Sequence, residues 1–252
     1  RQHDAQELLM FFLDGLHEDV NRSRGSVGKR AEASDTVLSS AATGSDSLLD
    51  HSSRIMEIFQ FKVRSKITFD GLEAEPSLKF EPMVYLSLPV SDVASSAPSG
   101  EVNLLDCLHQ FATHEELSQD DWAYCERTRQ CERSTKKLDI WTAPECLIVH
   151  LKRFAVDSTS GDTEKIDTFV QFSMDLDLTP FVAGPRGESV QYRLYAVVNH
   201  SGSLSSGHYT AYCKVGEEPH RRWYLFNDSL VSAASESDIV SREAYILFYE
   251  RV

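Results

Sequence analysis

The sequence predicts an α+β fold, a largely antiparallel sheet with its helices set to one side. Two observations lead to this prediction. The chain opens with an amphipathic helical pattern, and most of the rest is a succession of short apolar runs separated by turn residues. The 252 residues, 41% of them hydrophobic, are enough for a sizeable core in one large domain or two small ones.

The first predicted element is a helix over Asp4–Arg22 (DAQELLMFFLDGLHEDVNR). Asp4 followed by Glu7 three residues later predicts a capping box at its start. Apolar residues at helical spacing predict one apolar stripe, made of Ala5, Leu8, Leu9, Phe12, Leu13, Leu16 and Val20.

The composition changes between Ser23 and Ser53, where Ser, Ala, Gly and scattered charges dominate. Such a segment buries too little apolar area to offset the conformational entropy lost on ordering. Residues 23–53 are therefore predicted to form a mobile, disordered insertion.

The remaining chain alternates strand patterns with clusters of Gly, Pro, Ser or charge. The predicted strands are Ile58–Thr68, Met83–Leu88, Cys146–Phe154, Tyr192–Asn199, His208–Lys214, Trp223–Phe226 and Tyr245–Tyr249. The predicted turn segments between them are Ser91–Gly100, Asp157–Lys165, Ala183–Glu188 and Gly216–Arg222. A second helix is predicted over Leu104–His114.

Charge and composition exclude several classes of function. A net charge of −14 and a pI of about 5.0 argue against a nucleic-acid partner, which requires a basic face. The densest apolar run, Leu8–Leu13, is too short to cross a bilayer, so no membrane partner is expected. No leader opens the chain, and Arg1 followed at once by a helical pattern suggests part of a longer protein. Five scattered cysteines favour free thiols in an intracellular compartment, the cytoplasm or the nucleus.

The first candidate for chemistry is His208, which follows a Gly/Ser-rich stretch and begins a strand pattern (NHSGSLSSGHYTAYCKV). Imidazole exchanges a proton near neutral pH, and Gly207 before it leaves room for another group to approach closely. Taken alone, His208 is also compatible with a loop-end histidine that bonds a backbone carbonyl.

The second candidate is the segment Trp223–Val231 (WYLFNDSLV), in which a strand ends at Asn227, Asp228 and Ser229. These residue types are typical of a turn, but an Asn or Asp beside a histidine strand can also orient an imidazole. A base and its orienting group require a nucleophile. None of Cys107, Cys125, Cys131, Cys146 and Cys213 lies in the small-residue, helix-start setting that activates a thiol.

Five segments in order resemble the ubiquitin-specific proteases, the papain-like cysteine deubiquitinases, and together they span nearly the whole chain. These segments are QHDAQEL with LDGLHE in the first helix, FEPMVYLSLP, PECLIVHLKRF, the histidine segment Tyr192–Tyr212, and WYLFNDSLV. The resemblance implies a papain-like fold of thumb, fingers and palm, with part of the thumb lying before Arg1. It assigns residues 1–22 to the thumb, 54–147 to the fingers and part of the palm, and 148–252 to the palm.

The resemblance also implies roles for individual residues. His208 matches the general base and Asn227 the group that orients it through the Nδ1–H of the ring, with Asp228 beside it in a secondary role. Asp4 matches an acidic contact to the basic C-terminal tail of ubiquitin, and Gly207 and Tyr209 border the same tail. The loop from His200 to Gly207 matches a flexible loop, whereas His150 is expected to be a core or hydrogen-bonded histidine.

Two departures from the family pattern matter. The family's cysteine segment lies before the first helix, so the nucleophile is expected upstream of Arg1. The zinc ribbon that many relatives carry requires two CxxC pairs, but Phe69–Glu73 contains no cysteine and Cys125 is followed by Thr128 at the partner position. Cys131 is displaced by three residues. We therefore expect fingers without zinc, and no cofactor.

The sequence thus predicts a deubiquitinase that hydrolyses the isopeptide or peptide bond after the C-terminal glycine of ubiquitin in the complete protein. Its expected partners are ubiquitin and ubiquitinated proteins. One alternative is an inactive ubiquitin-binding pseudo-protease that acts as a scaffold. Another is an unrelated zinc-stabilised interaction module, which the lack of ligands disfavours. A cysteine in a helix-start context upstream of Arg1 would favour the enzyme over the scaffold.

Overall fold

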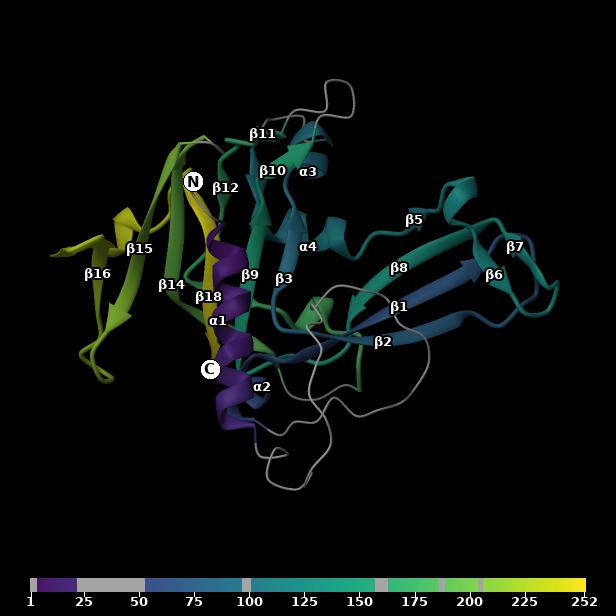
Figure 1. The fold of residues 1–252 in the computed structure, drawn as a ribbon, viewed down its shortest axis with the longest axis horizontal. Coiled ribbons are helices and arrows are strands. Elements are labelled where there is room, and N and C mark those ends of the chain that lie inside the picture. The colour runs from purple at the N-terminus through teal and green to yellow at the C-terminus, as the bar shows by residue number, and fades with distance from the viewer. Residues whose placement is uncertain (1–3, 22–52, 97–100, 157–162, 186–188, 204–205) are drawn as a thin grey trace, which may run out of the picture.

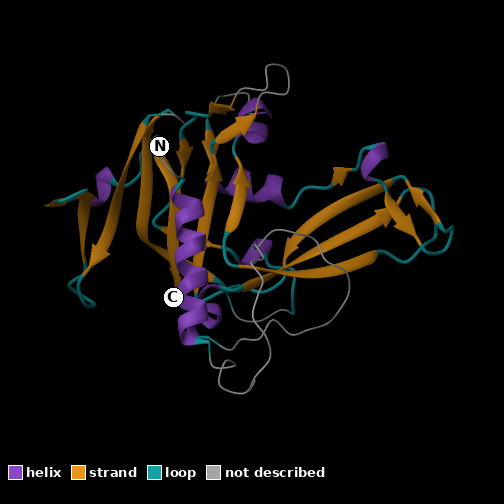
Figure 2. Cartoon of the chain, in the orientation of Figure 1, coloured by secondary structure: helices purple, strands orange, loops and turns teal. Residues whose placement is uncertain are grey.

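The computed structural model describes residues 4–21, 53–96, 101–156, 163–185, 189–203 and 206–252. Strands dominate it, and the helices are few and mostly short (Figure 2). The helices are α1 (Ala5–Val20), α2 (Arg54–Phe59), α3 (Ser91–Ser96) and α4 (Leu104–Phe111), with 3₁₀ turns at Gln119–Asp121, Thr179–Phe181 and Glu236–Asp238. None of the described helices is long and apolar enough to cross a membrane.

The main sheet has eight strands in the order β17-β16-β15-β14-β18-β9-β3, with β13 paired to β14 (Figure 1). Every pairing in it is antiparallel except that of β3 with β9. Its strands are β3 (Leu86–Pro89), β9 (Cys146–Lys152), β13 (Asp175–Asp177), β14 (Gln191–Gly202), β15 (Gly207–Val215), β16 (Arg222–Asn227), β17 (Leu230–Ala233) and β18 (Ala244–Arg251).

A second, narrow sheet extends away from the main sheet as an arm (Figure 1). Its order is β2-β1-β8-β5, formed by β1 (Phe61–Phe69), β2 (Ser77–Met83), β5 (Glu115–Glu116) and β8 (Ser134–Ile140). At its end lies the tip hairpin, β6 (Ala123–Cys125) with β7 (Gln130–Glu132). Two smaller pairs complete the fold: β10 (Phe154–Val156) with β11 (Thr163–Lys165), and β4 (Val102–Asn103) with β12 (Val170–Gln171).

Helices cover both faces of the main sheet, which differs from the one-sided arrangement that the sequence predicts. The reason is visible in β9, whose side chains alternate between two cores. Leu147 and Val149 join the larger core together with α3 and α4. Ile148 points the other way and joins the cluster beneath α1 and α2. Both faces of this central strand are apolar, so each requires its own cover.

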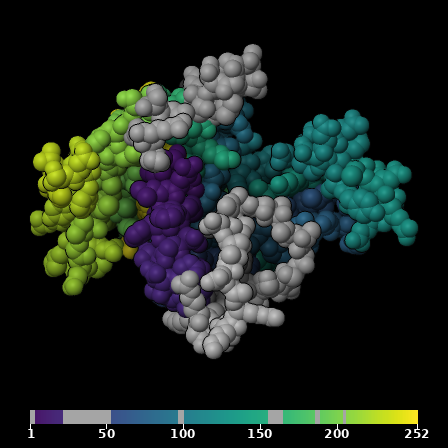
Figure 3. Space-filling view, viewed as in Figure 1, coloured from purple at the N-terminus to yellow at the C-terminus, as the bar shows by residue number. Residues whose placement is uncertain are grey.

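Helix α1 confirms the first predicted helix, but only part of its predicted stripe is buried. Asp4 caps the helix by accepting a hydrogen bond from the backbone N–H of Gln6. Leu13 is buried against β9 and β18, with Leu9 partly buried beside it. The other face of α1 (purple) is turned towards the viewer in Figure 3. Its exposed apolar residues are Leu8, Phe11, Phe12 and Val20. Leu8, Phe12 and Val20 of the predicted apolar stripe therefore lie outside the core.

Several predicted boundaries are corrected by local contacts. Ile58 begins no strand, because Ser53 is buried and caps the short helix α2 through its hydroxyl, which takes up residues 54–59. The single strand predicted over Met83–Leu88 is divided, because β2 ends at Met83 in the narrow sheet whereas β3 starts at Leu86 in the main sheet. The predicted turn segment Ser91–Gly100 contains helix α3.

The strands near the C-terminus agree better with the sequence. The predicted strands over residues 192–199, 208–214, 223–226 and 245–249 are all present, each somewhat longer than predicted. The predicted helix over residues 104–114 ends at Phe111. The predicted insertion over residues 23–53 lies, apart from Ser53, outside the described residues.

Candidate active site

The candidate site forms where β15 and β16 meet near one edge of the main sheet. The register pairs Ala211 with Phe226, so Asn227 lies opposite Thr210 on the neighbouring strand. His208 is two residues further along β15 and shares the same face, because side chains alternate along a strand. The two side chains meet, with His208 Nε2 and Asn227 Oδ1 separated by 2.7 Å.

The ring nitrogen in this contact corrects the sequence prediction. Asn227 faces Nε2 of His208, not Nδ1. The amide oxygen can only accept, so the neutral ring carries its proton on Nε2 and leaves the lone pair on Nδ1. Nδ1 is therefore the nitrogen with which His208 can accept a proton from a nucleophile, on the side of the ring away from Asn227.

Asp228 follows directly but takes no part in this contact. It lies in the two-residue turn that joins β16 to β17, where Asn227 pairs with Leu230. Its backbone has a φ of 50°, in the left-handed region that Asp tolerates better than most residues. Its side chain is exposed and forms no hydrogen bond with His208 among the described residues.

Asp4 and Tyr209 meet at the N-terminal end of α1, on the opposite face of the main sheet from α4. The Oδ1 of Asp4 accepts from Gln6 N at 2.6 Å, and its Oδ2 accepts from the hydroxyl of Tyr245 at 2.6 Å. The hydroxyl of Tyr209 accepts a long bond of 3.4 Å from the backbone N–H of Ala5. Two tyrosines from β15 and β18 thus fasten the start of the helix to the sheet.

A hollow of about 450 Å³ lies beside this helix start. Both acids and bases line it, among them Asp4, Glu7, His150 and Lys152. His150 bonds Ser87 Oγ through Nδ1 at 3.0 Å, as a hydrogen-bonded histidine should, and burial lowers its pKa to about 4. His150 is therefore neutral at physiological pH.

His200 was predicted to be a loop residue, and that prediction was wrong. It lies within β14 and is 2% exposed, its ring packed among those of Phe154, Tyr209 and Tyr245. Strand β14 continues to Gly202 because residues 200–202 still pair with β15. Burial lowers the pKa of His200, so this ring is also held neutral.

His200 also explains why a glycine precedes His208. A Cβ added to Gly207 would lie 2.2 Å from Nε2 of His200 and 2.7 Å from the carbonyl oxygen of Ser201. The space beside Gly207 is therefore taken by the ring of His200. From the sequence, this space was instead expected to let another group approach His208 closely.

The thiols form no hydrogen bond with the candidate base among the described residues. Burial raises the pKa of Cys107 to about 12, and it raises the pKa values of Cys146 and Cys213 as well. None of the five cysteines, all of them free, hydrogen-bonds His208 in the described part of the chain.

The tip hairpin places its two cysteines on opposite faces. Cys125 pairs with Gln130 and Cys131 with Tyr124, so the cysteines occupy neighbouring register positions whose side chains alternate. Cys125 is buried and Cys131 is exposed. The backbone N–H of Thr128 donates to the Cys125 thiol and lowers its pKa. Within the described residues no group of three or more His, Cys, Asp or Glu side chains could hold a metal ion.

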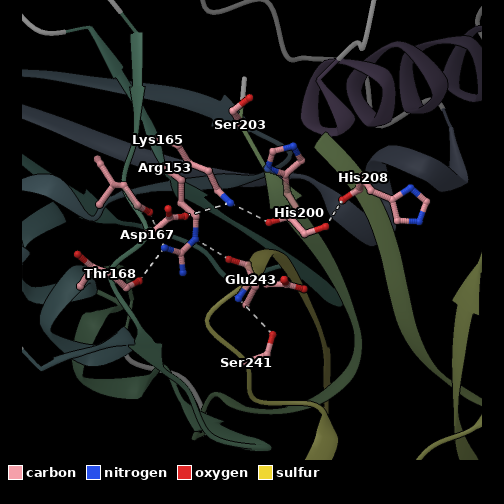
Figure 4. A network of polar contacts seen from close by, with 12 residues as sticks. Arg153, Lys165, Asp167, Thr168, His200, Ser203, His208, Ser241 and Glu243 are labelled. Atoms are coloured by element: carbon pink, nitrogen blue, oxygen red, sulfur yellow. Dashed lines mark hydrogen bonds and ion pairs between the residues drawn. The ribbon is translucent and has the colours of Figure 1, made fainter. Parts of the chain in front are cut away.

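Three residues with clear roles here were not singled out from the sequence. Tyr245 binds Asp4, whereas Arg153 and Lys165 belong to a polar network next to His200 (Figure 4). A signal existed for Arg153, because it stands two positions after Leu151 and next to the aromatic Phe154 in a largely apolar stretch, and a charged residue that is buried there must find partners.

An imidazole oriented by an asparagine amide, at the edge of a largely antiparallel sheet, is the pairing used by papain-like thiol proteases. The family described as "Ubiquitin carboxyl-terminal hydrolase" matches residues 1–249. The chain therefore belongs to the ubiquitin carboxyl-terminal hydrolase family, in its ubiquitin-specific protease branch.

Individual relatives agree. Ubiquitin carboxyl-terminal hydrolase 2 of Gallus gallus is 39% identical over 264 residues, which cover 99% of this chain and 68% of that protein. The Homo sapiens protein of the same name is 38% identical over 99% of this chain, but only 40% of its own length is covered.

Solved structures show the same fold. The SAGA DUB module of Ubp8, Sgf11, Sus1 and Sgf73 bound to monoubiquitin matches with a TM-score of 0.76 and 25% identity, over 100% of this chain and 49% of that one. The Ubp8 module bound to ubiquitin aldehyde matches with a TM-score of 0.74. The chain thus spans about half the length of these structures, and the predicted α+β fold is confirmed.

Proposed function

We propose that the complete protein is a thiol-dependent deubiquitinase that hydrolyses the bond after the C-terminal glycine of ubiquitin. The observation that supports this most directly is the 2.7 Å contact between His208 Nε2 and Asn227 Oδ1. It leaves Nδ1 as the basic nitrogen of an oriented, exposed imidazole. In this proposal the thiol is supplied by a cysteine outside the 252 residues.

The chemistry follows from the ring geometry. Nδ1 of His208 takes the proton of the thiol, and the thiolate attacks the carbonyl carbon of the terminal glycine. The imidazolium then gives this proton to the amine, which leaves, and the acyl group remains on the sulfur as a thioester. A water activated by the same nitrogen hydrolyses this thioester and releases the thiol. Asn227 holds the ring throughout, and Asp228 acts secondarily, through the turn geometry or by polarising a water near the oxyanion.

Substrate binding is assigned to the residues around the start of α1. Asp4 presents a carboxylate there, with Glu7 beside it and Gly207 and Tyr209 on the neighbouring hairpin. A negatively charged site suits the basic tail of ubiquitin, and the relatives solved with monoubiquitin and ubiquitin aldehyde agree with ubiquitin as the partner. Free cysteines agree with an intracellular location, in the cytoplasm or nucleus.

The alternative is a pseudo-protease that binds ubiquitin as a scaffold. The solved relative that is bound to monoubiquitin agrees with this alternative as well, because ubiquitin binding alone accounts for that complex. On this alternative the complete protein would bind ubiquitin without cleaving it.

The deciding experiment compares the complete protein with its His208→Ala variant on a fluorogenic C-terminal amide of ubiquitin. We expect hydrolysis by the wild type, loss after thiol alkylation, and loss in the variant, with ubiquitin binding retained in each case. The 252-residue chain by itself should not react with a ubiquitin probe that carries a C-terminal electrophile. Wild-type protein that binds ubiquitin but shows no hydrolysis would establish the scaffold instead.

A further inference from the structure

The polar network beside His200 contains the ammonium of Lys165, which lies where the pairing between β14 and β18 stops. Strand β18 pairs with β14 only as far as Asn199 opposite Ala244, after an irregularity in the register. His200, one residue further along β14, lies beyond the last residue pair that β14 forms with β18. Its backbone N–H donates to the carbonyl of Glu243 at 2.8 Å, and its carbonyl accepts from Lys165 Nζ at 3.0 Å. The Lys165 ammonium thus takes the place of the strand N–H that β18 no longer provides.

Lys165 is itself held in place. Its side chain is only 10% exposed, and it forms an ion pair of 3.1 Å with Asp167, which is 70% exposed. An exposed carboxylate contributes little through such a pair. The bond to the His200 carbonyl is the more enclosed of the two contacts, and it fixes the ammonium at the end of β14.

Arg153 forms hydrogen bonds with the two segments that flank His200, the one after Lys165 and the one after Glu243 (Figure 4). It is fully buried and donates from Nη1 to the carbonyls of Ile166 and Thr168, at 2.8 Å and 2.7 Å. Its Nε donates to the carbonyl of Ala244 at 2.7 Å. Ile166 follows Lys165 and Ala244 follows Glu243, so one guanidinium bonds the direct neighbours of the two residues that hold the backbone of His200.

The position of His200 is transmitted to the candidate base through short contacts. The ring of His200 fills the space beside Gly207, and the hydroxyl of Ser201 donates to the carbonyl of His208 at 3.3 Å. Movement of His200 along β14 would therefore displace the backbone on which His208 stands. A displacement of this kind is costly, because the imidazole must meet both Asn227 and the nucleophile.

We propose that Lys165 is a positioning residue for His208, with Arg153 as its anchor. This inference rests on the proposed function in so far as His208 is the base. Lys165 touches neither substrate nor the reacting atoms in this role. It supplies a hydrogen bond to β14 beyond the last residue pair that β14 forms with β18. This bond keeps the end of the β14–β15 hairpin in register.

The test uses Lys165→Met in the complete protein, since methionine keeps most of the stem and removes the ammonium. Lys165→Arg is the conservative variant that can still donate to the His200 carbonyl. Lys137→Met is the matched control, because it removes the ammonium of another partly buried Lys–Asp pair, Lys137–Asp139 at 2.8 Å in the narrow sheet. Asp167→Asn separates the ion pair from the bond to the carbonyl.

Two readouts are independent of each other. In hydrogen exchange, Lys165→Met should speed exchange of the His208 segment about tenfold relative to wild type, whereas Lys137→Met, Lys165→Arg and Asp167→Asn leave it close to wild type. In turnover of a ubiquitin amide, Lys165→Met should lower kcat on the order of tenfold with KM within about twofold, and Lys165→Arg should restore most of it.

The exchange readout does not need an active enzyme, so it remains decisive even if the complete protein proves to be a scaffold. The proposal is overturned if Lys165→Met lowers the melting temperature but exchanges at the His208 segment like the Lys137→Met control. It is also overturned if the wild type is active and Lys165→Met changes KM rather than kcat, because Lys165 would then act on substrate binding.

Discussion

The edge of the main sheet and the tip hairpin each carry two residues suited to chemistry, but only one of the two regions brings its pair together. In β15 and β16 the register places His208 and Asn227 on one face, two positions apart, and their side chains bond. In the tip hairpin the register places Cys125 and Cys131 one position apart, on opposite faces. The parity of strand pairing therefore decides which residues can act as a unit, because a shift of one residue reverses the face.

The largest expected effect tests the pair at the edge of the main sheet. In the complete protein, Asn227→Ala should lower turnover by about 10–10³-fold, because a neutral orienting partner contributes less than the roughly 10⁴-fold known for a triad Asp. His208→Ala should be at least as damaging. Asn227→Asp should be tolerated far better than Asn227→Ala, since a carboxylate can accept the same bond from Nε2.

Asp228→Ala is the matched control for this measurement, as Asp228 lies next to Asn227 without a bond to His208. We expect a small effect on turnover. If Asp228→Ala abolished activity while Asn227→Ala stayed near wild type, the assignment of the orienting residue would be wrong.

The second prediction concerns the close packing that keeps the hairpin in register. Gly207→Ala would force a Cβ to within 2.2 Å of His200 Nε2, so we expect a loss of about 1–3 kcal/mol in the free energy of unfolding. Gly15→Ala in α1 is the control, because nothing lies within 4 Å of its added Cβ. That variant should stabilise the protein by about 0.5–1 kcal/mol. Chemical denaturation of both variants measures the contrast, and equal effects would refute it.

The third prediction concerns pH and the sheet that supports the site. Burial lowers the pKa of His150 to about 4 from an ordinary value of 6.5, so the unfolded chain binds this proton more readily than the folded one. The stability that neutral His150 contributes is fully present above about pH 6.5 and is lost as the pH falls towards 4, at about 1.4 kcal/mol per unit of pKa shift.

His150→Gln removes this proton site and keeps a group that can bond Ser87. The variant should lose less stability than the wild type between pH 6.5 and 4, as measured by urea denaturation at a series of pH values. Identical pH profiles for the two proteins would show that His150 does not titrate as its burial requires.

The smallest expected effect concerns the tip hairpin. With Cys125 and Cys131 on opposite faces, the tip hairpin should hold substoichiometric zinc, and strong chelator should leave the melting temperature unchanged. Elemental analysis and thermal unfolding measure both quantities. About one zinc per chain, or a clear drop in melting temperature with chelator, would mean that other ligands complete a site at this tip.

Much of the site was accessible from the sequence because its residues lie in continuous patterns. His208 starts an alternating strand, and Asn227 ends the next one along the chain, so their approach requires only a hairpin. The choice between Nε2 and Nδ1 could not be read in this way. It depends on how the ring turns within the sheet, which no local pattern specifies.

The contacts around His200 were not predictable, because their partners come from four separate strands or their flanks. In the sequence, His200 directly precedes a Gly/Ser-rich stretch, so its pattern is typical of the start of a loop. Its burial follows only from Phe154, Tyr209 and Tyr245 gathering around it. The exposure of one face of α1 was not predictable for a related reason, since helical spacing shows which residues share a face but not which face meets the sheet.

The sequence by itself determined the α+β class, the helix at Asp4, most of the long strands of the main sheet and the family to which the chain belongs. These depend on short-range spacing, capping and motif order, which are written along the chain. Only the tertiary structure decided which nitrogen of His208 meets Asn227, why position 207 must be glycine, and that Lys165 closes the end of β14. Each of these depends on pairing register and on side chains brought together from distant segments, and a difference of one residue in register would reverse them.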